Sequence, residues 1–183
     1  MRRLVLVVFA LAAIADDAGR IVRPVDKSAF ATGPVEVNAS APGGKLELDG
    51  VGVTAEAPFP NVLHAKLPAS PGLHKLALVW ATGRQEIEFF VGPQAPEGFM
   101  PFRAHPPLAN AGCTQCHEVS KRGRFRFKGG CTDCHAAEAF PKSHTHKVEV
   151  LTECGMCHNA HGSTVQAHLL HDKAAACKLC HNQ

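Results

Sequence analysis

The 183-residue chain has no tyrosine, a single tryptophan and a formal net charge of only +3. Two of its positive charges lie at Arg2 and Arg3, so little net attraction for nucleic acid remains, and we expect no nucleic-acid partner. After residue 15 no apolar run approaches the roughly 20 residues that a membrane-spanning helix needs. The chain does contain eight cysteines and twelve histidines. This excess indicates metal or cofactor chemistry.

The N-terminus has the pattern of a secretory signal peptide. Two arginines precede an apolar run from Leu4 to Ala15, and two aspartates follow it. The run has 12 residues, which is short for a bilayer span, and it ends in small residues at the usual cleavage spacing. We predict a signal peptide over residues 1–15, with an uncleaved anchor as the alternative. The mature chain would then be periplasmic or extracellular, where thiols oxidise to disulfides unless other chemistry consumes them.

The two halves of the mature chain differ sharply in composition. Residues 16–100 contain 25 large apolar residues and no cysteine, whereas residues 101–183 contain 14 such residues and all eight cysteines. The Pro- and Gly-rich run that starts at Gly92 favours an extended, stiff connector over a helix or a sheet. We therefore predict a first domain at 16–92, a linker at 93–104 and a second domain at 105–183.

The first domain has the pattern of short strands separated by turns. Apolar and polar residues alternate most clearly at Leu46 to Leu48 and at Leu76 to Trp80, and Asp49-Gly50 is a tight-hairpin signal. This pattern indicates a small all-β domain, an antiparallel β-sandwich. We interpret His64 and His74 as exposed strand residues rather than ligands.

The segment from Ile21 to Gly92 resembles the bacterial immunoglobulin-like domains of secreted proteins. The motifs that carry the resemblance are Leu48-Asp49-Gly50 and the run from Pro71 to Leu76. The resemblance implies an immunoglobulin-like sandwich that serves as a spacer, or as a surface for docking or self-association, without chemistry of its own.

All eight cysteines fall into four copies of one motif, C-x-x-C-H. A random arrangement of the same composition would contain about 0.02 copies. Two thiols three positions apart can add to the two vinyl groups of a haem, and the adjacent histidine then reaches the iron as its proximal ligand. We therefore predict four covalently attached haem c groups. The attachment cysteines are Cys113, Cys116, Cys131, Cys134, Cys154, Cys157, Cys177 and Cys180, and the proximal ligands are His117, His135, His158 and His181.

Zinc sites and a disulfide framework are the alternatives. Successive cysteine pairs are separated by 14, 19 and 19 residues, which also resembles the spacing of zinc ribbons. A zinc ribbon, however, needs no histidine after every second cysteine, and haem attachment accounts for the thiols of an exported chain.

Distal iron ligands are expected among the second-half histidines outside the motifs. His105 and His146 each precede a motif cysteine by eight positions, which suggests a duplicated two-haem unit. His161 follows His158 by one helical turn, where it would face a neighbouring haem. For the fourth ligand we choose His171. The predicted distal set is His105, His146, His161 and His171, with His144 and His168 as spare candidates.

Residues 105–181 resemble the doubled C-x-x-C-H multihaem cytochromes c, through the run from His105 to Cys113 and the run from Cys157 to Ser163. The resemblance implies closely packed, bis-histidine haems that carry electrons outside the cytoplasmic membrane between a redox protein donor and acceptor. The first unit has Ser120 at the position where the second unit has His161. Either another histidine supplies the missing sixth ligand, or one haem iron stays five-coordinate.

These observations predict an electron carrier rather than a catalyst. The alternative is a multihaem redox enzyme, a reductase of small oxyanions at one open iron. We expect the small all-β sandwich to be followed along the chain by a second domain that is mostly coil and short helices. This second domain would wrap around its haems. The basic run from Lys121 to Lys128 would pair with haem propionates or dock an acidic redox partner, and a solvated hairpin is the alternative.

Overall fold

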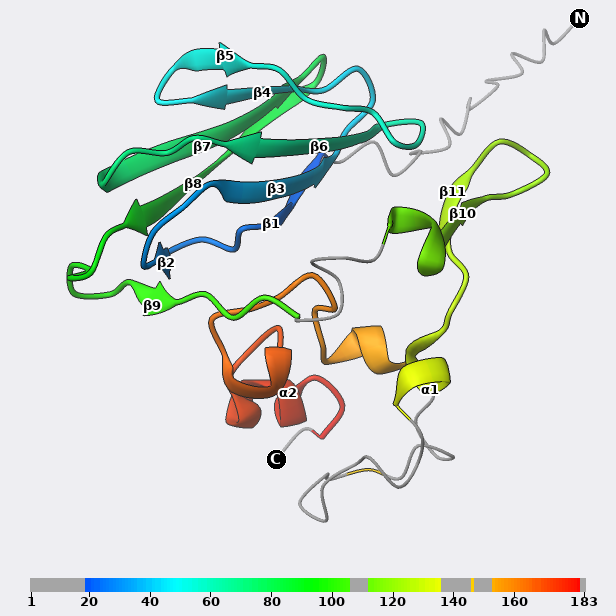
Figure 1. Cartoon of the computed structure of the whole chain (residues 1–183). Coiled ribbons are helices and arrows are strands. Elements are labelled where there is room, and N and C mark those ends of the chain that lie inside the picture. Colours follow the sequence, from blue (N-terminus) through cyan, green and yellow to red (C-terminus); the bar gives the residue numbers. More distant parts are fainter. Residues whose placement is uncertain (1–18, 106–111, 136–145, 147–152, 182–183) are drawn as a thin grey trace, which may run out of the picture.

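The computed structural model describes residues 19–105, 112–135, 146 and 153–181. The predicted signal peptide and the spare ligand candidate His144 lie outside these residues. Figure 1 shows the β-sheets of the first half above a cysteine-rich segment of turns and short helices. Within the described ranges, no helix combines the length and apolar character needed to cross a membrane.

The first half forms two sheets. The smaller sheet has the strand order β1-β3-β6 and is antiparallel throughout. Its strands are β1 (Arg20–Arg23), β3 (Val35–Ser40) and β6 (Val62–Leu67). The larger sheet has the order β5-β4-β7-β8-β2-β9. Its strands are β2 (Ser28–Phe30), β4 (Lys45–Leu48), β5 (Val51–Val53), β7 (Gly72–Trp80), β8 (Gly83–Val91) and β9 (Met100–Pro101).

Apolar side chains from both sheets form one core. Along β3 every second residue is buried, so that Val35, Val37 and Ala39 face inward. They join buried residues of the larger sheet, among them Leu46 of β4 and Phe89 of β8. Alternation with a period of two thus places one face of each strand in the core and the other face toward solvent.

The predicted antiparallel arrangement is wrong at β2. Ser28 to Phe30 run parallel to β8 on one side and parallel to β9 on the other. The segment that we expected to be a linker therefore enters the larger sheet at Met100 and Pro101. A hydrogen bond from Phe102 N to Ala29 O, 2.9 Å long, continues this pairing.

The predicted coil and short-helix character of the second domain is also wrong, because the described chain is mainly β and has a third sheet. β10 (His117–Val119) and β11 (Phe125–Phe127) form an antiparallel hairpin. Among the described residues of this half, the helices are α1 (Cys131–Cys134) and α2 (Lys173–Lys178), with the 3-10 turns η2 (Cys113–Gln115), η4 (Cys154–Met156) and η5 (Gln166–His168). Period-two alternation through the basic run favours strands, and the run takes part in a hairpin, the arrangement that we gave as the alternative for it.

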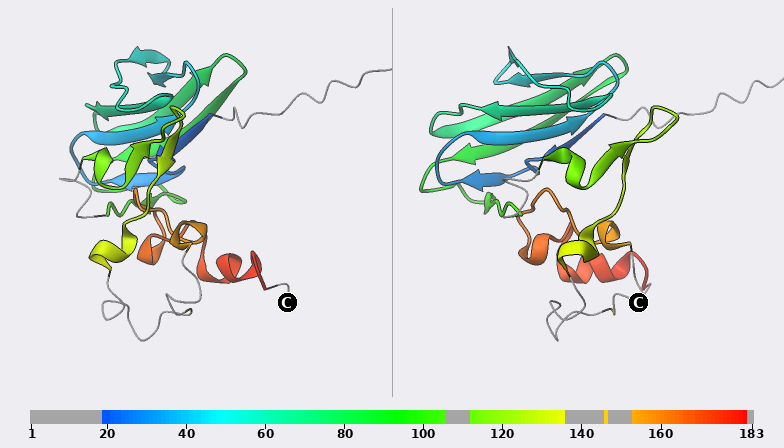
Figure 2. Two further views of the ribbon diagram at one scale, coloured as in Figure 1. Left: turned by 90° about the vertical axis from the view of Figure 1, so that its right-hand side faces the viewer. Right: turned by 45° about the vertical axis from the view of Figure 1, so that its right-hand side comes forward.

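The cysteine-rich segment contacts the first half of the chain and the residues that follow β9. Arg103 and Ser163 form an isolated antiparallel bridge. The rings of Phe59 and Phe125 lie 4.9 Å apart between centroids. At Gly162, where φ is +114°, a Cβ atom would lie 2.5 Å from the Phe102 ring, so only glycine permits this approach. Both views of Figure 2 show the β10–β11 hairpin beside the smaller sheet.

His74 is buried, so our interpretation of it as an exposed strand residue is wrong. Its Nδ1 lies 2.8 Å from Asp49 Oδ2 and its Nε2 lies 2.7 Å from Ser70 O. Both ring nitrogens face acceptors, and only the protonated imidazolium can donate from both. Burial lowers the pKa of His74, but the hydrogen bonds with Asp49 and Ser70 outweigh it, and the net pKa is raised above 6.5.

The free energy of unfolding is expected to depend on the protonation of His74. Because the folded state raises the pKa of His74, the stabilisation is complete below the unfolded pKa of about 6.5 and is lost as the pH rises through the folded value. Denaturant unfolding between pH 5 and 9 in wild type and in His74→Gln checks this. The variant should show a smaller loss of stability with rising pH, and parallel curves for the two proteins would contradict the prediction.

Candidate functional site

The four C-x-x-C-H motifs fold into similar single turns. They lie in η2, in α1, in η4 and at the end of α2, which runs on into a turn at Cys180. In the first turn Cys116 N donates to Cys113 O over 3.3 Å, and in the second His135 N donates to Cys131 O over 2.8 Å. The third and fourth motifs contain both kinds of hydrogen bond. Each turn therefore presents two thiols and one imidazole at helical spacing, on one side of the backbone.

None of the eight cysteines, all of which the structure describes, is in a disulfide. Cys113, Cys134, Cys177 and Cys180 are exposed, and the other four are half-buried. The thiols are therefore accessible at the surface of the turns.

Three of the motifs converge on Cys131. Burial is the main cause that raises the pKa of the Cys131 thiol, and a hydrogen bond with the Cys154 thiol and the nearby Cys116 thiol raise it further. These three cysteines belong to the second, third and first motifs, respectively. Groups attached to them would lie close together.

Three motif histidines lie opposite histidines that we predicted as distal ligands. The ring centroids of His117 and His161 are 5.8 Å apart, with planes 16° from parallel. For His135 and His105 the centroids are 5.7 Å apart and the Nε2 atoms 3.4 Å apart. The third pair, His181 and His146, has centroids 6.2 Å apart and planes inclined by 10°.

The separation of the Nε2 atoms of His105 and His135 is close to that of two imidazoles on opposite sides of one metal ion. With bonds of about 2 Å on each side, the two ligating nitrogens are about 4 Å apart. The pair His105–His135 is slightly closer than that, so small movements would admit an iron. The chemistry of the donors also fits, since paired imidazoles are common axial ligands of c-type haems.

The fourth motif histidine, His158, is oriented by the backbone. Its Nδ1 lies 2.8 Å from Ala167 O and can donate to it. His171, our choice for the fourth distal ligand, is exposed and is not placed against a motif histidine in the described segments. The ring of the spare candidate His168 lies 5.5 Å from that of His105.

Three of the paired histidines have a lowered pKa. His161 is the most affected, because burial, followed by His117 and the charges of Arg23 and Arg20, lowers its pKa to about 4. Burial also lowers the pKa of His117 and of His105. Neutral imidazole is the form that binds a metal.

The β10–β11 hairpin gives the first motif an apolar wall that our sequence reasoning missed. Phe125 stacks on His117 with 4.7 Å between ring centroids, and Phe127 lies 5.7 Å from the same ring. On the opposite face Arg126 forms an ion pair with Glu118, so this arginine already has a carboxylate partner. The signal was the period-two alternation of Phe with Arg, which places both aromatic rings on the side of His117.

The prediction of a metal-binding group is wrong for the described residues. They contain no group of three or more histidine, cysteine, aspartate or glutamate side chains that could hold a metal ion. Pairs of imidazoles remain, and these suit an iron whose other ligands come from a porphyrin.

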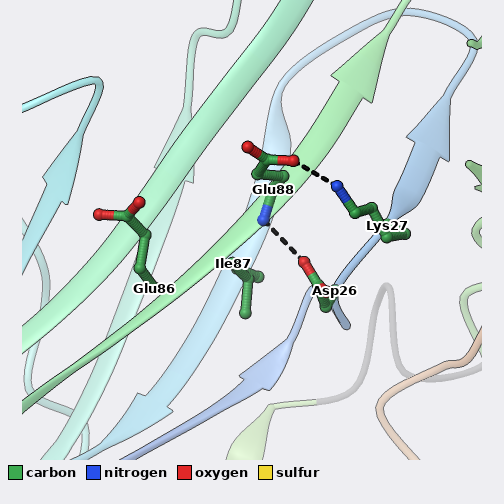
Figure 3. A pocket seen from close by; sticks show the side chains of 5 residues that line it. All are labelled: Asp26, Lys27, Glu86, Ile87 and Glu88. Atoms are coloured by element: carbon green, nitrogen blue, oxygen red, sulfur yellow. Dashed lines mark hydrogen bonds and ion pairs between the residues drawn. The ribbon is translucent and has the colours of Figure 1, made fainter.

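A shallow pocket lies elsewhere, on the larger sheet. Asp26, Lys27, Glu86, Ile87 and Glu88 line it. Figure 3 shows Lys27 paired with Glu88 and Glu88 N donating to Asp26 Oδ1, while Glu86 pairs with Arg84 outside the pocket. The pocket contains none of the site residues predicted from sequence.

Comparisons with known proteins do not assign a family. No protein family matches the chain, and no curated protein does. Among solved structures, an FMN-binding β-glucuronidase from Facaelibacterium prausnitzii L2-6 has a TM-score of 0.37 and 17% identity over 46% of this chain. A polysaccharide lyase has a TM-score of 0.33 and 14% identity over 42% of the chain. The matches span only 13% and 12% of those proteins.

Proposed function

We propose that the chain is an exported electron carrier with four covalently attached c-type haems, packed closely and ligated by pairs of histidines. The observation that carries the proposal is the pairing of three motif histidines with His161, His105 and His146 at centroid distances of 5.7 to 6.2 Å. Four repeats of a haem-attachment motif with no disulfide among their cysteines support it further.

The haem supplies an iron that alternates between the ferric and ferrous states. The residues of this chain would hold it and control its surroundings. The motif thiols would anchor it, the paired imidazoles would ligate the iron, and Phe125 with Phe127 would exclude water near His117. Two strong ligands to an iron would leave little to rearrange on electron transfer, which favours transfer over catalysis at the three motifs whose histidines are paired.

The convergence of the first three motifs on Cys131 supports the close packing of the haems. Electrons would then pass from one haem to the next without leaving the cysteine-rich segment. We propose a periplasmic or extracellular location, a redox protein as donor and another as acceptor, and the β-sheets as the docking part of the chain.

Spectroscopy of the exported, haem-loaded protein tests this function. We expect four haems per chain, an EPR spectrum of low-spin ferric haem alone, and no change in the ferrous absorption spectrum on adding CO. Material produced in the cytoplasm without haem attachment is the matched control. Exported protein that carries disulfides and no haem would refute the proposal, and a high-spin fraction that binds CO or nitrite would favour the oxyanion reductase.

A further inference from the structure

Strand β1 reaches the first histidine pair. Asn159 Nδ2 donates to Val22 O over 3.3 Å, and Asn159 Oδ1 accepts from His161 N over 3.0 Å. One buried amide thus connects the strand to the histidine opposite His117. The charges of Arg23 and Arg20, both on β1, lie close enough to act on the His161 ring.

Arg23 is the buried cation at this junction. Its side chain is 12% exposed, its Nη1 lies 2.7 Å from Glu36 Oε2, and its guanidinium lies 5.3 Å from the centre of the Phe102 ring. The Phe102 ring itself packs against Gly162, next to His161. Arg23 is therefore held in place by β3 on one side and by the start of the cysteine-rich segment on the other.

The guanidinium is incompletely satisfied. Its Nε atom is buried and has no hydrogen-bond partner within the described residues. A buried donor of a charged group without an acceptor is costly, so such an atom indicates a ligand that supplies one. A carboxylate matches best, because it accepts charge-assisted hydrogen bonds from guanidinium groups.

We propose that Arg23 Nε donates to a propionate carboxylate of the haem attached at Cys113 and Cys116, so that the β-sheets raise the reduction potential of that haem. The inference rests on the proposed function. A nearby cation disfavours the ferric form, which carries one more positive charge than the ferrous form. The first half of the chain is then part of the redox centre as well as a docking module.

Arg23→Gln tests the proposal in the haem-loaded full-length protein by optical redox titration. One of the four one-electron steps should move to lower potential. We expect about a tenfold lower ratio of reduced to oxidised haem at a fixed applied potential, equivalent to about 59 mV for one electron. The matched control is Arg84→Gln, because Arg84 is exposed and pairs with Glu47 and Glu86.

A second variant is expected to shift the reduction potential in the opposite direction. Glu36→Gln removes the negative partner of Arg23, so the same step should move to higher potential. Opposite shifts of the potential in the two variants would indicate an electrostatic effect. Damage to the fold would instead shift the potential in the same direction in both variants. Arg23→Lys keeps the charge and should give a potential between those of wild type and Arg23→Gln.

Two outcomes would overturn the proposal. Titration curves of Arg23→Gln that match those of Arg84→Gln would show that Arg23 does not act on a haem. Shifts of the same sign in Arg23→Gln and Glu36→Gln would assign the change to altered packing. Failure of the proposed function is distinguishable, because wild-type protein would then contain no haem.

Discussion

The double variant Cys131→Ser/Cys134→Ser is expected to retain three haems per chain in place of four. Serine cannot form the thioether bonds that attach haem to this motif. Cys131 also lies where three motifs converge, so loss of the second haem should expose the neighbouring groups. We therefore expect lower resistance of the cysteine-rich segment to proteolysis as well as a lower haem-to-protein ratio, because under the proposed function the haems would form the interior of this part.

Intact mass and haem absorption per protein measure this result directly. Thr132→Ser is the matched control, since it changes the same turn without touching a thiol, and it should keep all four haems. If the double variant and the control carry the same number of haems, the second motif is not an attachment site. If the variant loses every haem, attachment at the motifs depends on the second haem being in place.

The local part of the site could be predicted from sequence, because its interactions span few residues. Within one motif the thiols and the imidazole are brought together by hydrogen bonds that span three or four positions, such as His181 N to Cys177 O at 2.9 Å. The repeat register also pointed to His105 and His146, which the structure places opposite His135 and His181.

The long-range part could not be predicted in this way. Arg23 and His161 are far apart in sequence, and only the packing of β1 against Asn159 brings them together. The parallel pairing of β2 with β8 and β9 likewise joins distant segments. His74 was misjudged because its burial and the partners of its ring, Asp49 and Ser70, depend on how the hairpins pack.

The variant His161→Ala is expected to leave one haem iron without its sixth ligand. Its ring lies opposite His117 and is the most strongly desolvated of the paired histidines. Removing it leaves the iron at His117 with one protein ligand, and a five-coordinate haem changes from low-spin to high-spin. We expect a high-spin EPR signal from one haem in four and binding of about one CO per chain in the ferrous state, where wild type binds none.

The space left by the imidazole makes the experiment reversible. Added imidazole should enter the cavity and restore the low-spin spectrum, which damage to the fold would not allow. His64→Ala is the control, because His64 contacts Glu36 on the smaller sheet and no motif histidine. A His161→Ala protein that stays fully low-spin and binds no CO would remove His161 from the ligand set. If His168→Ala produces a high-spin haem that binds CO and His161→Ala does not, the spare candidate His168 is the distal ligand in place of His161. The iron at His117 would then receive its second histidine ligand from η5.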